Sequence, residues 1–487
     1  MSISLRASSG AGGSRNTYDR TVNFVTDYGG VSGGSQAANN AAATAFNTAY
    51  AGFTGRTQLI VPPGTYNITT GFADTGGSVL GGSKLTVSAY GATFQNLGGI
   101  GTIGTFNDNA HNAPFTTTSA GASTVTLVTS GQTSLFTAGK WVLVTGIDMQ
   151  GGGNPQNPGF FEFKKIASIG TGTLTFTEPL TNSYKSTWPV YAPGNASNLD
   201  QGGPGNIYVL RDSWDQEIEF KGATFSDVGG LIYNKCRVAL WTDCTFVTYG
   251  ACPTYNLLYR STRCTGAGTG GLEVDKCVQR IEFIDSMYRA VDFQSSSINE
   301  LYVSNMVQTG SNLRWRGGAN QRNTFINCGF GAFSFNEMNY GAMGPTTMTN
   351  CTATSGDWFI QTMPFSDITE EGGGVLSYAG GPGSANSAGG SGSFWCFTPG
   401  QNCILVDSSN AWARSFQVSD VTQSAGRTYV TTNLPFPVPG TINGKTSPWK
   451  IASHPCADLT MVNCSGNSMF TAQSLLPAHT PFQSWTL

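Results

Sequence analysis

The chain has 487 residues, of which 64 are Gly and only 11% are charged, and its formal net charge at pH 7 is -3. Because it contains no basic run, nucleic acid and anionic membrane surfaces are excluded as expected partners. No apolar stretch approaches the roughly 18 residues of a membrane span, and no basic segment precedes an apolar run at the N-terminus. We therefore expect neither membrane insertion nor a signal peptide.

The first segment, residues 1–17, is rich in Ser, Gly and Ala, and is predicted to be a flexible or partner-ordered arm. Residues 18–112 are predicted to start and cap the fold. They contain a strand at 22–24, an Ala-rich helix that begins after the N-cap Ser35, and a second strand at 59–61.

Residues 113–200 are predicted to be an inserted antiparallel β domain. Leu85-Thr-Val87 with Gly91-Ala-Thr-Phe94 is nearly repeated as Ile218-Glu-Phe220 with Gly222-Ala-Thr-Phe225, which indicates that much of the chain between them is an insertion. This intervening chain carries no regular period. It reads instead as antiparallel strands of a small barrel or sandwich, at 123–128, 139–144, 161–166 and 173–176.

Residues 201–365 are predicted to form the central coils of a solenoid, because one short phrase recurs there. The phrase has alternating apolar and polar residues, then Asn, Asp or Gly, then a small residue, as in Phe325-Ile-Asn-Cys-Gly-Phe330. The small residue stands at positions 223, 244, 264, 286, 306, 328 and 351. A period of about 20 to 25 residues is typical of a solenoid. Short strands and sharp turns favour a parallel β-helix over a leucine-rich repeat.

The recurring turn predicts two stacks of side chains. A ladder of amides is expected at Asp243, Asp285, Asn305, Asn327, Asn350 and Asn463. At the small position, four of the eleven cysteines are expected to be buried and reduced, with some bridges as the alternative: Cys244, Cys264, Cys328 and Cys351. The better disulfide candidates lie off this position: Cys236, Cys252, Cys277, Cys396, Cys403 and Cys456.

A second strand of each coil follows the first. Its triplets have large apolar outer residues, and they are Leu272-Glu-Val274, Val291-Asp-Phe293, Leu313-Arg-Trp315, Phe333-Ser-Phe335 and Trp358-Phe-Ile360. Because side chains alternate across a strand, the outer residues should point inward and the middle residue outward. Glu273, Asp292, Arg314 and Ser334 should then stand in one exposed column, about 4.8 Å apart from coil to coil.

Beyond the central coils the period fades. Residues 366–400 are predicted to be a Gly/Ser-rich loop, and residues 401–487 to hold C-terminal coils and a tail. Leu405–Ser408 and Val418–Val421 are expected to resume the coils. Leu459–Ser465 repeats the phrase clearly.

The order of strand, Asp27-Tyr-Gly-Gly30 turn, Ala-rich helix and Val61-Pro-Pro-Gly-Thr-Tyr66 resembles the start of the pectate-lyase-like superfamily of right-handed β-helices, which includes many phage tailspikes. The resemblance covers about residues 18–100 by motif and 205–360 by repeat. It implies a right-handed all-β solenoid whose N-terminal helix caps the core. It also implies a parallel homotrimer. The acidic run usual in the family is replaced here by Val31–Asn40, which weakens any inference about chemistry.

Glu273 and Asp292 are the candidate catalytic residues. Two carboxyl groups on neighbouring coils would lie about 5 to 6 Å apart, near the spacing of a retaining glycosidase pair, and one could act as the acid. Arg314 would bind a sugar carboxylate or keep Asp292 ionised, and Asp275 is a substitute partner. The alternative is that a solvent-facing column simply carries polar residues.

No metal or cofactor is expected. The sequence has no CxxC pair, and its three histidines, His111, His454 and His479, are far apart. Glu219 and Glu282 share an outward position but stand three coils apart, which is too far for a catalytic pair. Aromatic residues for sugar stacking are available at Tyr288, Tyr302, Trp358 and Tyr340, although the apolar positions of the phrase assign most of them to the core.

Three functions fit these features. The first is a virion tailspike or tail fibre that binds, and cleaves, bacterial surface polysaccharide by hydrolysis or lyase chemistry, acting at the bacterial surface and joined to other tail proteins through residues 1–17. The second is a non-enzymatic receptor-binding or structural virion protein. The third is a free polysaccharide lyase or hydrolase.

Overall fold

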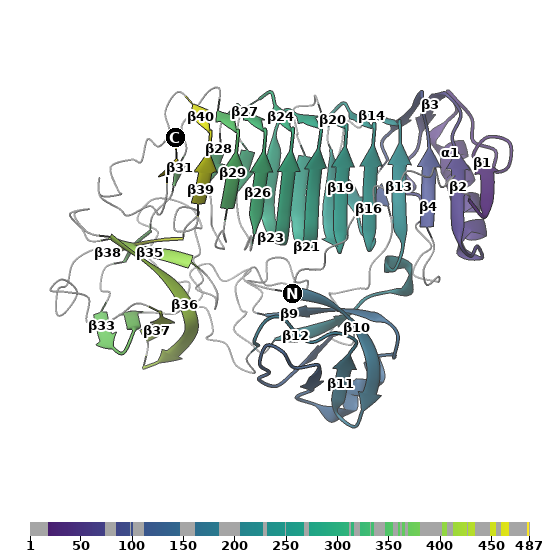
Figure 1. The fold of residues 1–487 in the computed structure, drawn as a ribbon. Helices are drawn as coiled ribbons and strands as arrows, with labels where there is room; N and C mark the ends of the chain where they lie inside the picture. Colours follow the sequence, from purple (N-terminus) through teal and green to yellow (C-terminus); the bar gives the residue numbers. More distant parts are fainter. Residues whose placement is uncertain are drawn as a thin grey trace, which may run out of the picture.

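Three parallel ladders of strands wind around one axis, and two antiparallel modules branch from them (Figure 1). This computed structural model describes residues 18–73, 84–97, 99–100, 112–146, 161–184, 205–226, 231–248, 250–266, 272–310, 313–315, 322–331, 333–335, 346–353, 359–360, 363–365, 369–379, 402–406, 413–425, 427–433, 449–453, 459–466 and 485–486. The predicted parallel β-helix with an N-terminal helix and an inserted antiparallel domain is confirmed.

Helix α1 spans Gln36–Ala51 and lies at the N-terminal end of the solenoid (Figure 1). It begins after Ser35 because the Oγ of this residue accepts a hydrogen bond from the N–H of Ala38 at 3.3 Å. Its buried face includes Phe46 and Tyr50, whose rings stack at 5.5 Å. The helix therefore covers apolar residues that the first coil would otherwise expose.

The strands of the solenoid form a long, a short and a triplet ladder. The long ladder contains β1 (Arg20–Asn23), β2 (Arg56–Ile60), β4 (Lys84–Ser88), β13 (Glu217–Lys221), β16 (Val238–Thr242), β19 (Leu258–Thr262), the second halves of β21 (Leu272–Ile284) and β23 (Val291–Ser304), β26 (Asn323–Ile326), β29 (Thr346–Thr349), β39 (Leu459–Val462) and β41 (Trp485–Thr486). The short ladder contains β3 (Gly64–Asn67), β5 (Ala92–Gln95), β14 (Thr224–Ser226), β17 (Thr245–Phe246), β20 (Thr265–Gly266), β22 (Met287–Tyr288), β24 (Val307–Gln308), β27 (Gly329–Phe330), β30 (Thr352–Ala353) and β40 (Ser465–Gly466). The triplet ladder contains β6 (Gly99–Ile100), β15 (Ile232–Asn234), β18 (Ala251–Asn256), the first halves of β21 and β23, β25 (Leu313–Trp315), β28 (Phe333–Phe335) and β31 (Phe359–Ile360).

Each coil visits the long, short and triplet ladders in turn. Between the triplet and long ladders the chain bends, and there Tyr255 and Lys276 have φ values of 60° and 63°. The register of β21 with its neighbours also shifts at this point. The solenoid therefore has three outer faces, one for each ladder.

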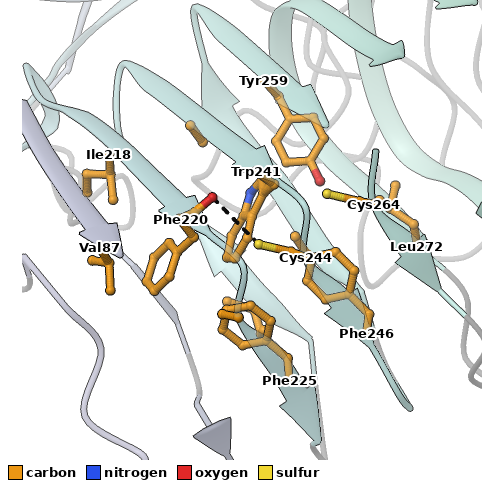
Figure 2. Packing of buried hydrophobic residues seen from close by; sticks show 14 of the residues in the cluster. Val87, Ile218, Phe220, Phe225, Trp241, Cys244, Phe246, Tyr259, Cys264 and Leu272 are labelled. Carbon is orange, nitrogen blue, oxygen red and sulfur yellow. Dashed lines mark hydrogen bonds between the residues drawn. The ribbon is translucent and has the colours of Figure 1, made fainter. Parts of the chain in front are cut away.

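The core consists of side chains stacked from coil to coil, as Figure 2 shows. Phe220 and Trp241 stack with ring centroids 4.8 Å apart, and Phe225 and Phe246 stack at 5.4 Å. Parallel in-register pairing places the same position of successive coils side by side, so each apolar position of the phrase becomes a continuous column. Each fully buried aromatic side chain contributes about 1.5–3 kcal/mol through removal of apolar surface from water.

The turn between the long and short ladders forms the predicted stack of amides. Asn305, Asn327 and Asn350 all have positive φ values, of 51°, 54° and 54°. The Nδ2 of Asn327 donates to the Oδ1 of Asn305 at 3.1 Å, and the Nδ2 of Asn350 donates to the Oδ1 of Asn327 at 3.0 Å. Asn and Asp suit this place because short polar side chains tolerate the left-handed conformation.

One coil departs from this turn chemistry. Arg263 takes the position with a φ of 50°, and its guanidinium pairs with Asp243 of the preceding coil at 2.7 Å. A left-handed backbone costs a residue of this kind about 1–2 kcal/mol. The guanidinium makes two hydrogen bonds to this carboxylate, from Nε to Oδ1 and from Nη2 to Oδ2. This turn therefore combines a less favourable backbone with a bidentate ion pair in place of the amide stack.

The cysteines at the small position of the phrase are buried and reduced, as predicted: Cys244, Cys264, Cys328 and Cys351. The disulfide prediction is wrong for Cys236, Cys252 and Cys277, which are also buried thiols. Cys236 packs in the solenoid core and Cys277 packs where the first module meets the coils, so these sulfurs belong to separate clusters. Cys396 and Cys456 lie outside the described residues, as does the side chain of Cys403.

The first module is a six-stranded antiparallel sheet with the order β7 (Asn112–Pro114), β12 (Asn206–Val209), β9 (Trp141–Thr145), β10 (Phe161–Gly170), β11 (Thr173–Phe176) and β8 (Thr124–Thr126). Strand β12 lies beyond residue 200, where we expected the insertion to end, because it pairs with β7 and β9. Two short 3-10 helices, Ser130–Leu135 and Asp212–Trp214, accompany it. The module packs on the coils through Trp214, whose Nε1 donates to the carbonyl of Tyr255 at 2.7 Å.

The second module was not predicted. Seven antiparallel strands follow the order β32 (Met363–Phe365), β38 (Trp449–Ser453), β35 (Asn402–Val406), β36 (Ala413–Ser424), β37 (Arg427–Thr432), β34 (Val375–Ala379) and β33 (Thr369–Gly372). Leu405–Ser408 and Val418–Val421 do not resume the coils, because β35 and β36 pair antiparallel with each other. The predicted loop at 366–400 begins with the β33–β34 hairpin, and residues 380–400 lie outside the described residues. The solenoid continues at Leu459, which pairs with Thr346.

Both modules leave the solenoid at the same corner of a coil. The first follows β6 of the triplet ladder and ends before β13 of the long ladder, and β4 and β13 are direct neighbours. The second follows β31 and ends before β39, which is the neighbour of β29. The two modules therefore branch from opposite ends of the triplet ladder, and the first extends along the coils as far as β23, where Nδ2 of Asn299 donates to the carbonyl of Phe161 at 3.1 Å.

Candidate functional site

The middle residues of the triplet ladder form the column that the sequence predicted. Glu273 of β21 is in register with Asp292 of β23, which is in register with Arg314 of β25. The residues on either side of Glu273 and of Asp292 are fully buried: Leu272, Val274, Val291 and Phe293. Glu273 and Asp292 themselves are half-buried, as expected for residues on the outer face of the strand.

This arrangement suits acid and base chemistry on a sugar polymer. Neighbouring parallel strands lie about 4.8 Å apart, which places the two carboxyl-bearing residues near the separation of about 5–5.5 Å used by retaining glycosidases. The next step of the column is Arg314, a cation suited to a carboxylate of substrate. The described column therefore supplies two acids, with Arg314 in backbone register on the next coil; the side chain of Arg314 lies outside the described part of the structure.

Asp275 does not extend this column. Its backbone is in register with Thr254, at the point where the pairing of β21 shifts and the chain bends toward the long ladder. The proposed role of Asp275 as a substitute partner stays a prediction, since its side chain lies outside the described part of the structure.

An exposed aromatic residue that the sequence reasoning missed lies on the same ladder. Tyr233 of β15 has 39% of its surface exposed, between the buried residues Ile232 and Asn234. It is in register with Cys252 of β18, and counting back from the pair of Thr254 and Asp275 places Cys252 beside Glu273. Tyr233 is thus two strand steps, or about 9.6 Å, from the column of acids.

Of the aromatic residues predicted for sugar stacking, the structure describes Tyr288 and Tyr302, and neither lies on the triplet ladder. Tyr288 is fully buried, and its hydroxyl bonds with Ser261 inside the core. Tyr302 is half-buried on the long ladder, where it is in register with Glu282. Trp358 and Tyr340 lie outside the described residues. A repeat shows only which side of a strand a residue occupies, so the exposure of Tyr233 could not be derived from it.

The glutamate carboxylates on the outer face of the long ladder form ion pairs with arginine and lysine side chains. Glu282 is 5% exposed and accepts hydrogen bonds from Arg260 and Arg280. Arg280 and Arg322 both pair with Glu300, the latter at 2.8 Å. Burial opposes ionisation of Glu282, but the hydrogen bonds from the two arginines outweigh it and hold its pKa below the ordinary value. Glu282 therefore stays ionised and is unsuited to act as an acid.

Glu219 lies three strand steps from Glu282, as predicted. The register runs from Glu219 to Leu240, Arg260 and Glu282. Its own carboxylate pairs with Lys221 at 3.3 Å. These two glutamates do not form a pair.

The described ranges hold no cluster of three or more His, Cys, Asp or Glu side chains able to bind a metal ion. All three histidines lie outside those ranges. Within the part of the chain that the structure describes, we also find no helix with the length and apolarity to cross a bilayer.

No family model matches the chain, and no curated protein matches it. Membership of the pectate-lyase-like superfamily therefore stays a prediction. Among solved structures, the tailspike gp61 of Pseudomonas phage phi297 aligns with 89% of this chain and 98% of its own, at a TM-score of 0.35 and 8% identity. The gp54 tailspike of Acinetobacter baumannii bacteriophage AP22, solved with A. baumannii capsular saccharide, aligns with 81% and 89% at a TM-score of 0.23 and 9% identity. The tailspike gp49 of Pseudomonas phage LKA1 aligns with 86% and 93% at the same score and identity. At these scores no inference about activity follows.

Proposed function

We propose that this protein binds a polysaccharide along its triplet ladder and cleaves it there. The observation that carries the proposal is the register of Glu273, Asp292 and Arg314 on three consecutive strands. Two carboxyl groups at this spacing fit glycoside hydrolysis. An arginine next to two carboxylates fits equally an acidic sugar whose proton is removed in lyase chemistry.

The position of the column along the axis supports a polymeric substrate. The triplet ladder begins at β6 and ends at β31, and one module branches from each of these ends. The column occupies the middle of this ladder, with the exposed Tyr233 two strands away. Cys252, which lies between Tyr233 and Glu273, is fully buried, so a sugar chain would follow the column from Glu273 toward Asp292 and Arg314 and not reach Tyr233 along this ladder.

The direct test uses isosteric variants on the same polymer. Purified bacterial capsular polysaccharides and lipopolysaccharides are incubated with the wild type, Glu273→Gln and Asp292→Asn, and new reducing ends and unsaturated uronates are measured. Each variant should cleave about 10²- to 10⁴-fold more slowly, which is the usual contribution of an acid or base. Glu219→Gln is the matched control and should keep the wild-type rate, because Glu219 lies on the long ladder.

Two results would contradict the proposal. Cleavage at the wild-type rate by both variants would remove the column as the reaction centre. Binding without any product from the wild type would instead support a non-enzymatic receptor-binding protein. The product distinguishes the two reactions, since only a lyase leaves an unsaturated uronate.

We place this activity in a phage tailspike that acts at the bacterial surface, assembled as a homotrimer and attached to other tail proteins through residues 1–17. Support comes from the likeness of the segment from Asp27 to Tyr66 to the pectate-lyase-like superfamily, which includes many phage tailspikes. Light scattering coupled to size exclusion should give three times the chain mass of 51.2 kDa. A monomer at micromolar concentration would contradict the trimer.

A further inference from the structure

A second exposed aromatic ring lies on a different corner of the solenoid. Tyr90 follows β4, where the long ladder turns into the short one, and 56% of its surface is exposed. A Cβ added to Gly222 of the next coil would lie 2.1 Å from this ring. The ring therefore rests directly on the backbone of Gly222 and still presents a large surface to solvent.

Polar groups adjoin the edge of this ring. The Tyr90 hydroxyl donates a hydrogen bond to the Oδ2 of Asp243 at 3.3 Å. Arg263 donates from Nε to Oδ1 of Asp243 at 2.7 Å and from Nη2 to Oδ2 at 3.1 Å. These bonds use two of the five N–H groups of the guanidinium, and the arginine side chain is 54% exposed. The hydrogen bond from Arg263 holds the pKa of Asp243 below its ordinary value, so the carboxylate is ionised.

The residue types here differ from those of the same turn in later coils. Asn305, Asn327 and Asn350 continue the stack with amide hydrogen bonds, whereas an ion pair replaces the amides beside Tyr90. Arg263 keeps a left-handed backbone that an asparagine would adopt more easily. A strained residue retained beside an exposed ring indicates a functional use.

We propose that Tyr90, Asp243 and Arg263 form a binding subsite for one neutral pyranose unit of a polysaccharide. The apolar face of the sugar ring would stack on Tyr90. The Asp243 carboxylate would accept from one hydroxyl group of the sugar, and the Arg263 guanidinium would donate to its neighbour. Asp285 follows Arg263 in the same stack, so the three turn positions carry two acids and one base, which disfavours an acidic sugar.

This inference deepens the proposed function and rests on it, since the subsite would be a second anchoring point for the same class of polymer. A polymer bound at two places is held more tightly than at either place alone. The subsite itself takes no part in cleavage, so its variants should retain turnover of short oligosaccharides.

The test measures binding of simple glycosides by saturation-transfer NMR. The probes are methyl β-D-glucopyranoside, methyl β-D-galactopyranoside and methyl β-D-glucuronide, with the wild type, Tyr90→Ala, Tyr90→Phe and Arg263→Asn. Tyr90→Ala and Arg263→Asn should each weaken binding of a neutral glycoside about tenfold. Tyr90→Phe keeps the stacking surface and should stay within about threefold. The glucuronide should bind more weakly than its neutral counterparts.

Arg263→Asn separates a binding role from a structural one, because it restores the residue type of the later coils. A thermal midpoint equal to or above that of the wild type, together with lost binding, supports the subsite. A lowered midpoint with unchanged binding would overturn it, as would a wild type that binds none of the glycosides. Neither of these results bears on cleavage at Glu273. The proposed function is tested separately, by the polysaccharide cleavage assay with Glu273→Gln and Asp292→Asn.

Discussion

Glu282 offers a quantitative test of how the outer face of the long ladder is stabilised. Glu282→Gln keeps the shape of the side chain and removes its charge. Its carboxylate accepts hydrogen bonds from Arg260 and from Arg280, the latter at 2.6 Å. A hydrogen bond to a charged group contributes about 1.5–3 kcal/mol and a neutral one about 0.5–1.5 kcal/mol, so the two bonds together lose about 2–3 kcal/mol. Because the arginine side chains are 41% and 40% exposed, screening reduces the expected loss to about 1–2 kcal/mol.

The same residue predicts a pH dependence. Folding lowers the pKa of Glu282 from 4.5, so the folded state favours the ionised carboxylate. Its stabilisation is complete above pH 4.5 and is lost as the pH falls through the lower pKa of the folded protein. The difference in stability between the wild type and Glu282→Gln should therefore be full at neutral pH and shrink in acid.

Urea unfolding followed by tryptophan fluorescence measures this difference at a series of pH values. Glu178→Gln is the control, because Glu178 is exposed and the described residues give it no ion pair. It should unfold at the wild-type midpoint throughout. Equal midpoints for Glu282→Gln and the wild type at pH 7 would refute the reasoning, and so would a difference that grows as the pH falls.

Three further outcomes are expected. Trp241→Ala removes a fully buried indole stacked on Phe220 and should lower the free energy of unfolding by about 3–5 kcal/mol in the same urea assay, whereas Trp241→Phe should cost less. Asn327→Ala and Asn327→Gly both remove two amide hydrogen bonds at a residue whose φ is 54°. Asn327→Ala should be about 1 kcal/mol less stable than Asn327→Gly, because glycine tolerates this backbone; equal unfolding midpoints would contradict backbone strain at this position. Interactions with Cys328 raise the pKa of Cys351 to about 11, so a thiol reagent such as dithionitrobenzoate should leave Cys351 unmodified in the native protein at pH 8 and modify it in urea.

The repeat was visible in the sequence because a parallel in-register ladder needs the same kind of residue at each coil. The turn residues, the stacked cysteines and the outward column all follow from that requirement. Asn327, with its left-handed backbone, and the buried Cys328 are two neighbouring examples. The column of Glu273, Asp292 and Arg314 could be aligned for the same reason. The reaction assigned to it stays a proposal.

Features that depend on contacts between distant segments could not be derived in this way. The alternating apolar residues of β35 and β36 read like further coils, because alternation is the same in parallel and antiparallel strands. The Tyr90 ring packs against Gly222 of the next coil. The first module lies between these two residues in the sequence, so their contact could not be derived from the repeat. Arg263 was overlooked because its turn lacks the Asn or Asp of the other copies.

The shared branch point of the two modules has a consequence for how such a protein can vary. Since β4 already pairs with β13 and β29 with β39, the solenoid is continuous across each excursion. Either module could be exchanged for another of different sequence by splicing at this corner while these strand pairs are kept, provided that a replacement for the first module again covers Tyr255 and Cys277. Natural variants could therefore acquire new flanking surfaces by recombination while inheriting an unaltered rod.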